Sequence, residues 1–158
     1  MAYNRWLYRR KKARLLQGLE RAGGFHPKGC SVLEVATGSG VYVEMWKQLG
    51  IGRLAGIDIS QNATDHLKGR FPEFSFFKRD LSAPNLVSVV GGDFDLVTAV
   101  DMLYHVVDDG DFAVALDNLA QATKPGGLLA IHELCEFRRK LDTDSSRSWT
   151  VIPRQAGH

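Results

Sequence analysis

The sequence predicts a doubly wound α/β fold, in which helices cover both faces of a mainly parallel, Rossmann-like sheet. Short apolar, β-rich segments alternate with helical segments along most of the chain, and this alternation predicts parallel strands joined by helical crossovers. The turns between these segments are rich in Gly, with 16 Gly against 5 Pro. A length of 158 residues with 44% hydrophobic residues fits one folded domain and excludes a disordered, collagen-like or disulfide-built chain.

The first expected element is an amphipathic helix over residues 4–22, because this stretch lacks Pro and places Leu15 and Leu19 one turn apart. Further helices are expected over residues 41–49, from the N-cap Ser60 to about residue 69, and from 111 to 123, where the sequence Lys-Pro-Gly-Gly follows. Residues 82–92 are expected to form a loop with one helical turn at most. Strands are expected at residues 31–36, 53–59, 74–77, 94–100 and 128–132.

Charge and cysteine content indicate which partners, metal or redox sites and cellular compartment to expect. Residues 1–28 carry a net charge of +7 and the remainder −5, so the first helix either has a solvated basic face or attracts an anionic substrate or nucleic acid. Cys30 and Cys135 lie 105 positions apart without nearby ligand-spaced His, which argues against a zinc site or a redox pair. Neither an export signal nor a membrane span is evident. We therefore expect a cytoplasmic protein without a membrane association.

Glycines and acids follow the first three expected strands. Gly38 and Gly40 come directly after the first strand, where glycine lets the backbone approach a ligand closely. Asp58 ends the second strand 20 residues after Gly38, the spacing at which a carboxylate accepts ribose hydroxyls, and Asp80 follows the third strand. Each residue also has a structural reading, as a tight turn or a helix cap. Their order along successive strand ends favours a nucleoside site.

These residues resemble the motifs of the class I S-adenosylmethionine-dependent methyltransferases, over about residues 32–133. Glu34, Gly38 and Gly40 match the acid and the last two glycines of the motif E/D-x-G-x-G-x-G, whereas Ala36 replaces the first glycine. The resemblance implies that Asp58 binds the ribose and Asp80 contacts the adenine. The implied cofactor-binding set is Glu34, Ala36, Thr37, Gly38, Gly40, Asp58, Ile59, Asp80, Leu81 and Asp101.

Two later stretches are also similar to family motifs: residues 94–101 to the fourth-strand motif and residues 123–129 to the L-K-P-G-G-x-L turn. Complete members carry seven strands, the last two as an antiparallel pair, and only 25 residues follow Glu133 here. The sequence therefore predicts one short strand or docked segment and a C-terminal part that is incomplete. If the fifth strand is left as an exposed edge, a homodimer through that side is expected. The expected organisation is a lid helix over residues 1–24 and a cofactor-binding domain over 25–158.

The resemblance also assigns roles to charged and aromatic side chains. A cationic sulfonium is held favourably by the carboxylates of Glu34 and Asp101 and by an aromatic face from the first helix, for which Tyr3, Trp6 and Tyr8 are candidates. His105 is the candidate general base for a hydroxyl acceptor, with a structural His as the alternative. No metal is expected, since Asp101, Asp108 and Asp109 near His105 serve equally well as helix caps.

The resulting expectation is methyl transfer from S-adenosylmethionine to a small-molecule hydroxyl, amine or carboxyl acceptor, with S-adenosylhomocysteine as product. The alternatives are a non-catalytic S-adenosylmethionine-binding or partner module and an NAD-type oxidoreductase. The oxidoreductase is disfavoured because G-x-G-x-x-G requires Gly at the position of Val43. A nucleic-acid methyltransferase is disfavoured because the fourth strand lacks an Asn/Asp-Pro-Pro-aromatic signature.

Overall fold

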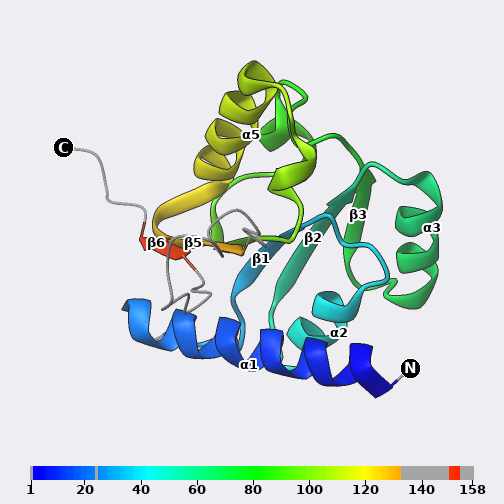
Figure 1. Cartoon of the computed structure of the whole chain (residues 1–158), viewed down its shortest axis with the longest axis vertical. Helices are drawn as coiled ribbons and strands as arrows, with labels where there is room; N and C mark the ends of the chain where they lie inside the picture. The colour runs from blue at the N-terminus through cyan, green and yellow to red at the C-terminus, as the bar shows by residue number, and fades with distance from the viewer. Residues whose placement is uncertain (1, 24, 133–149, 154–158) are drawn as a thin grey trace, which may run out of the picture.

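The structure, a computed structural model, describes residues 2–23, 25–132 and 150–153. Its strands form one six-stranded sheet in the order β3-β2-β1-β4-β5-β6 (Figure 1). Strands β1 to β5 are parallel and β6 is antiparallel to β5, which confirms the mainly parallel, Rossmann-like fold. The elements are α1 (Ala2–Gly23), β1 (Ser31–Val35), α2 (Val41–Gln48), β2 (Arg53–Asp58), α3 (Gln61–Arg70), β3 (Ser75–Lys78), α4 (Leu86–Val90), β4 (Phe94–Val100), η1 (Leu103–His105), α5 (Asp109–Ala122), β5 (Thr123–His132) and β6 (Thr150–Pro153).

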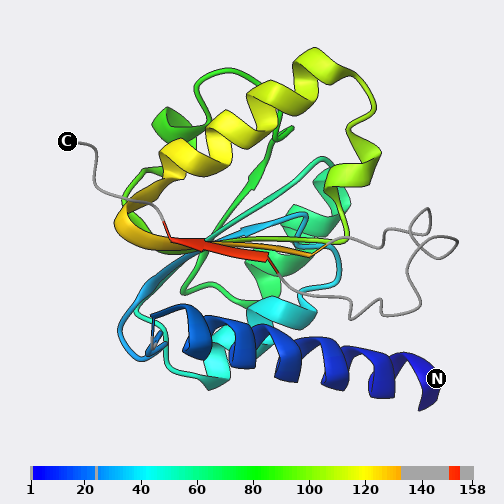
Figure 2. The same cartoon turned by 60° about the vertical axis from the view of Figure 1, so that its left-hand side comes forward.

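Helices cover both faces of the sheet. Figure 2 views the sheet close to edge-on, with α1 and α2 below it and α5 above it. Successive strand residues alternate between the two layers, as the pleat requires: Val32 and Leu96 pack with α1 and α2, whereas Leu33 and Val97 pack with α4 and α5. Both layers are buried, so the strands read as continuous apolar runs in the sequence.

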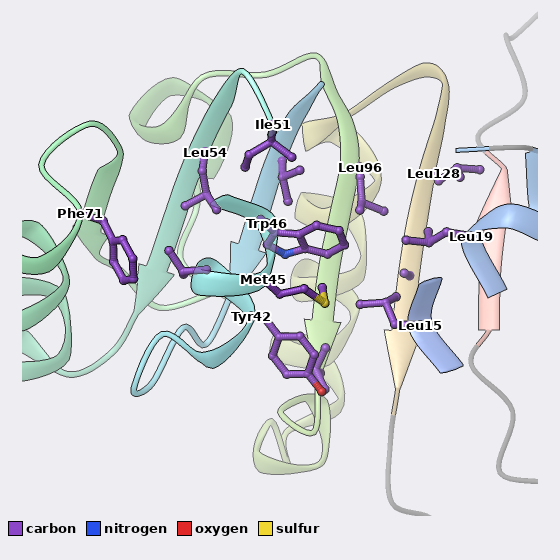
Figure 3. Packing of buried hydrophobic residues seen from close by; sticks show 14 of the residues in the cluster. Leu15, Leu19, Tyr42, Met45, Trp46, Ile51, Leu54, Phe71, Leu96 and Leu128 are labelled. Atoms are coloured by element: carbon purple, nitrogen blue, oxygen red, sulfur yellow. The ribbon is translucent and has the colours of Figure 1, made fainter. Parts of the chain in front are cut away.

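The C-terminal half of α1 belongs to the main core. Leu15 and Leu19 are fully buried and join Trp46 of α2 in the cluster on the lower face of the sheet (Figure 3). Helix α1 also contacts β5 and β6. This packing holds the helix across the sheet and brings its middle turns towards the ends of β4 and β5.

The expected elements are confirmed, with small differences in their bounds. Ser60 caps α3, since its hydroxyl accepts a hydrogen bond from the backbone N–H of Ala63. Strand β5 begins at Thr123, five residues earlier than expected, because Thr123 pairs with Phe94 before the register shifts around the Lys-Pro-Gly-Gly turn. The loop over residues 82–92 contains the one-turn helix α4.

Strand β6 bears on two sequence expectations. It is the one short strand expected after β5, and it pairs with Leu128–Ile131. The expected homodimer depended on an exposed edge of β5. Strand β6 covers this edge, and the edge therefore gives no support to a dimer. Of the helices in the described part of the chain, none has the length and apolar character that crossing a membrane requires.

Candidate functional site

The candidate site lies where the strand order reverses, at the carboxyl ends of β1 and β4. From this point the strand order runs outward from β1 to β3 on one side and from β4 to β6 on the other. Ligands of open α/β sheets bind outside the strand ends at such a point. The turn after β1 has three residues with positive φ: Ala36 at 57°, Gly38 at 50° and Gly40 at 78°. Ala36, which stands where the motif has its first glycine, thus has a left-handed φ that glycine adopts without strain.

Asp58, at the end of β2, contacts the glycine turn that follows β1. Its Oδ2 accepts a hydrogen bond from the backbone N–H of Gly38 at 2.8 Å, and its Oδ1 accepts one from Ser60 at 2.9 Å. A carboxylate has about four acceptor sites, so these two bonds leave capacity for ligand hydroxyls. The structure therefore brings Asp58 against the glycine turn, as the sequence spacing predicts.

The other predicted strand-end residues differ in exposure. Ile59 is 71% exposed beside Asp58, which is unusual for a large apolar side chain and offers a surface for a flat apolar ligand. Asp80 is exposed, and its Oδ1 accepts hydrogen bonds from the N–H and hydroxyl of Ser82. Leu81 is buried in the core. Asp80 is thus held in a local turn on the same edge of the sheet.

Glu34 has a different environment from these aspartates. It is 2% exposed, and its Oε2 accepts hydrogen bonds from Trp46 Nε1 at 2.8 Å and from the Thr98 hydroxyl at 2.5 Å. Burial raises the pKa of Glu34 to about 7, although the bonds from Thr98 and Trp46 lower it in part. This carboxyl connects β1, α2 and β4 inside the fold.

Asp101, which directly follows β4, is the centre of a charged cluster. Its Oδ1 lies 2.6 Å from Nδ1 of His132, the last residue of β5, and its Oδ2 accepts a hydrogen bond from the Lys11 ammonium of α1. Burial tends to raise the pKa of Asp101, but the bonds from His132 and Lys11 outweigh it, and the net direction is downward. Asp101 also has a positive φ of 51°, strain that its contacts must offset.

Two hydroxyls near the glycine turn are buried without a hydrogen-bond partner in the described structure: Thr37 Oγ1 and Tyr42 Oη. Tyr42 is 9% exposed, and Tyr8 of α1 packs edge-on against its ring. Burial, followed by the charges of Glu34 and Asp101, raises the pKa of Tyr42. Unpartnered buried hydroxyls are costly, so each of these two calls for a polar partner, either water or a ligand atom.

His105, the predicted base, lies exposed in η1 with its ring 4.1 Å from that of Tyr104. The carboxylate of Asp101, four residues before His105 in the sequence, contacts His132. Asp108 caps α5 by accepting from the N–H groups of Gly110 and Asp111, in line with the capping reading. Within the described residues, no three His, Cys, Asp or Glu side chains gather as metal ligands.

Sequence reasoning missed Lys11, His132 and Tyr42 as site residues. His132 was detectable, because the strand-end rule applied to the fifth strand places it beside Asp101. The contact of Lys11 with Asp101 spans 90 positions and depends on how α1 crosses the sheet, which periodicity does not report. Among the aromatic candidates, Tyr8 packs edge-on against Tyr42, whereas Trp6 is exposed with the Arg10 guanidinium over its ring. The Tyr3 side chain lies outside the described residues.

The strand order defines a Rossmann-like α/β domain, and the acidic strand ends mark a candidate ligand site at the carboxyl edge of its sheet. The chain belongs to the methyltransferase domain family, whose model matches residues 4–158. This membership leaves the NAD-type oxidoreductase without support.

Curated relatives and solved structures agree with this family. A ubiquinone biosynthesis O-methyltransferase from Methylococcus capsulatus is 33% identical over 103 residues, which are 63% of this chain and 41% of that protein. A ribosomal protein L11 methyltransferase from Symbiobacterium thermophilum is 26% identical, over 79% of this chain and 39% of its own length. The N-methyltransferase NodS from Bradyrhizobium japonicum, solved with S-adenosyl-l-homocysteine, has the same fold, with a TM-score of 0.63, 23% identity and coverage of 78% of this chain and 61% of NodS. The chain thus spans about two fifths of the length of these curated relatives.

Proposed function

We propose that the protein transfers a methyl group from S-adenosylmethionine to a hydroxyl of a small-molecule acceptor. The observation that carries this proposal is the contact of Asp58 with the glycine turn, because it puts a carboxylate with spare acceptor capacity beside a backbone that a nucleoside can approach. Membership of the methyltransferase domain family supports the same assignment.

The residues present fit the adenosyl group. Asp58 would accept the ribose hydroxyls, the exposed Ile59 would cover the purine, and Asp80 would accept from its amine. The donor supplies an electrophilic methyl on a sulfonium. Asp58 on this edge provides negative charge that favours this cation, whereas the charge of Asp101 is compensated by the Lys11 ammonium. Thr37 and Tyr42 would satisfy their unpartnered hydroxyls on polar atoms of the ligand.

The hydroxyl acceptor rests on the relatives, several of which are named as O-methyltransferases at 28–33% identity. NodS is named as an N-methyltransferase, but its likeness concerns the fold. Nucleic acid remains disfavoured as an acceptor. We keep the lid role of residues 1–24 and the cytoplasmic location as proposals; the free thiol of Cys30 is compatible with a reducing compartment.

Calorimetric titration with S-adenosylmethionine and S-adenosylhomocysteine tests the donor site. Asp58→Asn should weaken binding about 10- to 100-fold, since hydrogen bonds to a charged group contribute about 1.5–3 kcal/mol. Asp65→Asn, which changes an exposed acid on α3, is the matched control and should bind as the unaltered protein does. Absence of binding by the unaltered protein, or equal binding by Asp58→Asn, would contradict the proposal.

A second candidate function is a non-catalytic S-adenosylmethionine-binding or partner module. The contact of Asp58 with the glycine turn fits this function as well, because it bears on donor binding and not on transfer. Turnover separates the two candidates: transfer of a labelled methyl group to any member of a panel of small phenols, amines and carboxylates supports the enzyme. Tight donor binding without transfer to the whole panel supports the module.

A further inference from the structure

Helix α1 carries exposed basic residues that the proposed donor site leaves without a role. Five exposed residues recur at intervals of three or four positions, so they lie along one side of the helix. We call them the arginine stripe: Trp6, Arg10, Arg14, Gln17 and Arg21. Trp6 is 52% exposed, and the Arg10 guanidinium lies over its ring. The opposite side of α1 is buried against the sheet, so the stripe faces away from the core.

Helix α5 has an exposed side that combines apolar and acidic residues. Phe112 and Leu116 are each 37% exposed and lie one turn apart, and Ala120 continues the line by another turn. Exposed carboxylates border this line at Asp109 and Asp117, and α5 contains no Lys or Arg. We call these five residues the acidic face. Exposed apolar side chains that are rimmed by polar residues are typical of an interaction surface.

Neither surface has its charges neutralised within the described residues. Of the ion pairs there, the one on α1 joins Lys11 to Asp101, and none includes an arginine of the stripe. None of these ion pairs includes a carboxylate of α5 either. Asp117 accepts a hydrogen bond from the Gln121 amide, which carries no charge. Both surfaces therefore keep their charge for a partner of the opposite sign.

The arginine stripe and the acidic face complement each other, whereas neither complements itself. Two stripes in contact would oppose like charges, and so would two acidic faces. Along α1, Arg14 and Arg21 are about 10 Å apart, at about 1.5 Å per residue. Along α5, Asp109 and Asp117 are about 12 Å apart, so two arginines of one surface match two carboxylates of the other. The aliphatic stems of the arginines would then cover the apolar line between the carboxylates.

We propose that the arginine stripe of one copy of the protein binds the acidic face of the next copy. Helices α1 and α5 lie on opposite faces of the sheet (Figure 2), so the two surfaces of one copy cannot meet. The contact is therefore heterologous, and it builds closed rings or open chains of copies instead of a two-fold dimer. It does not involve the edge of β5, which β6 covers, and it holds whether or not the protein transfers methyl groups.

The salt dependence of self-association tests the charge complementarity. The Debye length is about 30 Å at about 0.01 M salt and about 3 Å at about 1 M, so a contact between charged surfaces weakens steeply over this range. In sedimentation velocity we expect assemblies larger than two copies of the 17.5 kDa chain at about 0.01 M salt and single chains at about 1 M. Single chains at both salt concentrations, or assemblies that do not dissociate with salt, would overturn the proposal.

One variant of each surface tests where the copies meet. Arg14→Gln with Arg21→Gln removes two charges from the arginine stripe, and Leu116→Arg puts a cation into the acidic face. Both variants should sediment as single chains at about 0.01 M salt. Lys68→Gln with Lys78→Gln is the control, because it removes the same charge from exposed positions outside α1 and should leave assembly unchanged. If either surface variant assembles as the control does, the proposal is wrong.

An equal mixture of the two surface variants is the most specific test. It contains one unaltered acidic face, on the α1 variant, and one unaltered arginine stripe, on the α5 variant, so we expect pairs with one copy of each and nothing larger. Thermal unfolding of each variant shows that it has folded. If Leu116→Arg does not fold, Asp117→Lys replaces it, since this changes an exposed charge and no apolar residue. A mixture that stays as single chains, or that grows beyond pairs, would overturn the proposal.

Discussion

The buried carboxyl of Glu34 should make the stability of the fold depend on pH. Its pKa is raised by burial from 4.5 to about 7 in the folded protein. Between these values the unfolded chain releases a proton that the native state keeps, so the free energy of unfolding falls as pH rises and levels off above about 7. About 1.4 kcal/mol corresponds to a tenfold change in proton affinity, so the free energy of unfolding should fall by about 3 kcal/mol in all.

Glu34→Gln should remove this loss, because the amide is never ionised and its oxygen still accepts from Trp46 and Thr98. Urea unfolding at several values from about pH 5 to about pH 8 gives the two stability profiles. The variant should be more stable than the unaltered protein at the upper end by up to about 3 kcal/mol, with the difference shrinking towards acid pH. Glu20→Gln, an exposed change on α1, is the control. Parallel profiles for Glu34→Gln and the unaltered protein would refute the reasoning.

Three further changes test the packing around the glycine turn and Glu34. Ala36→Gly should stabilise the fold by about 0.5–1 kcal/mol, because glycine adopts the φ of 57° without strain; a lower Tm would contradict this. Gly40→Ala should destabilise it by about 1–3 kcal/mol in urea unfolding, since φ is 78° and the new Cβ would lie 2.5 Å from Leu67 Cδ2; an unchanged midpoint would be the contrary result. Trp46→Phe should cost about 1–3 kcal/mol by leaving Glu34 with one donor fewer, and should cost less in the Glu34→Gln background; equal costs in both backgrounds would show that the hydrogen bond contributes little.

The arrangement of strands was largely predictable because local patterns carry it. The apolar run at residues 94–100 matches β4 to the residue, and Ser60 is the N-cap of α3 as its position suggests. The beginning of β5 was not predictable from breakers, because Lys-Pro-Gly-Gly interrupts the pairing with β4 without ending it. Gly127 shows why: a Cβ there would lie 2.9 Å from the carbonyl oxygen of Phe94, so glycine serves close strand approach as well as the turn.

The site was predictable where one residue spacing defines it. The 20 positions from Gly38 to Asp58 correspond to a direct hydrogen bond in the structure. The environment of Glu34 was not predictable, because its partners Trp46 and Thr98 come from an adjacent helix and a strand 64 positions away. The same holds for Lys11 and Asp101, whose contact depends on the angle at which α1 crosses the sheet.

We propose above all that the edge of the sheet beside Asp58 binds the adenosyl group. A crystal structure of the protein with S-adenosylhomocysteine measures this most directly. We expect both ribose hydroxyls within hydrogen-bond distance of the Asp58 carboxylate and the purine against Ile59. A ligand bound at any other edge of the sheet, or an Asp58 carboxylate turned away from the sugar, would contradict the account.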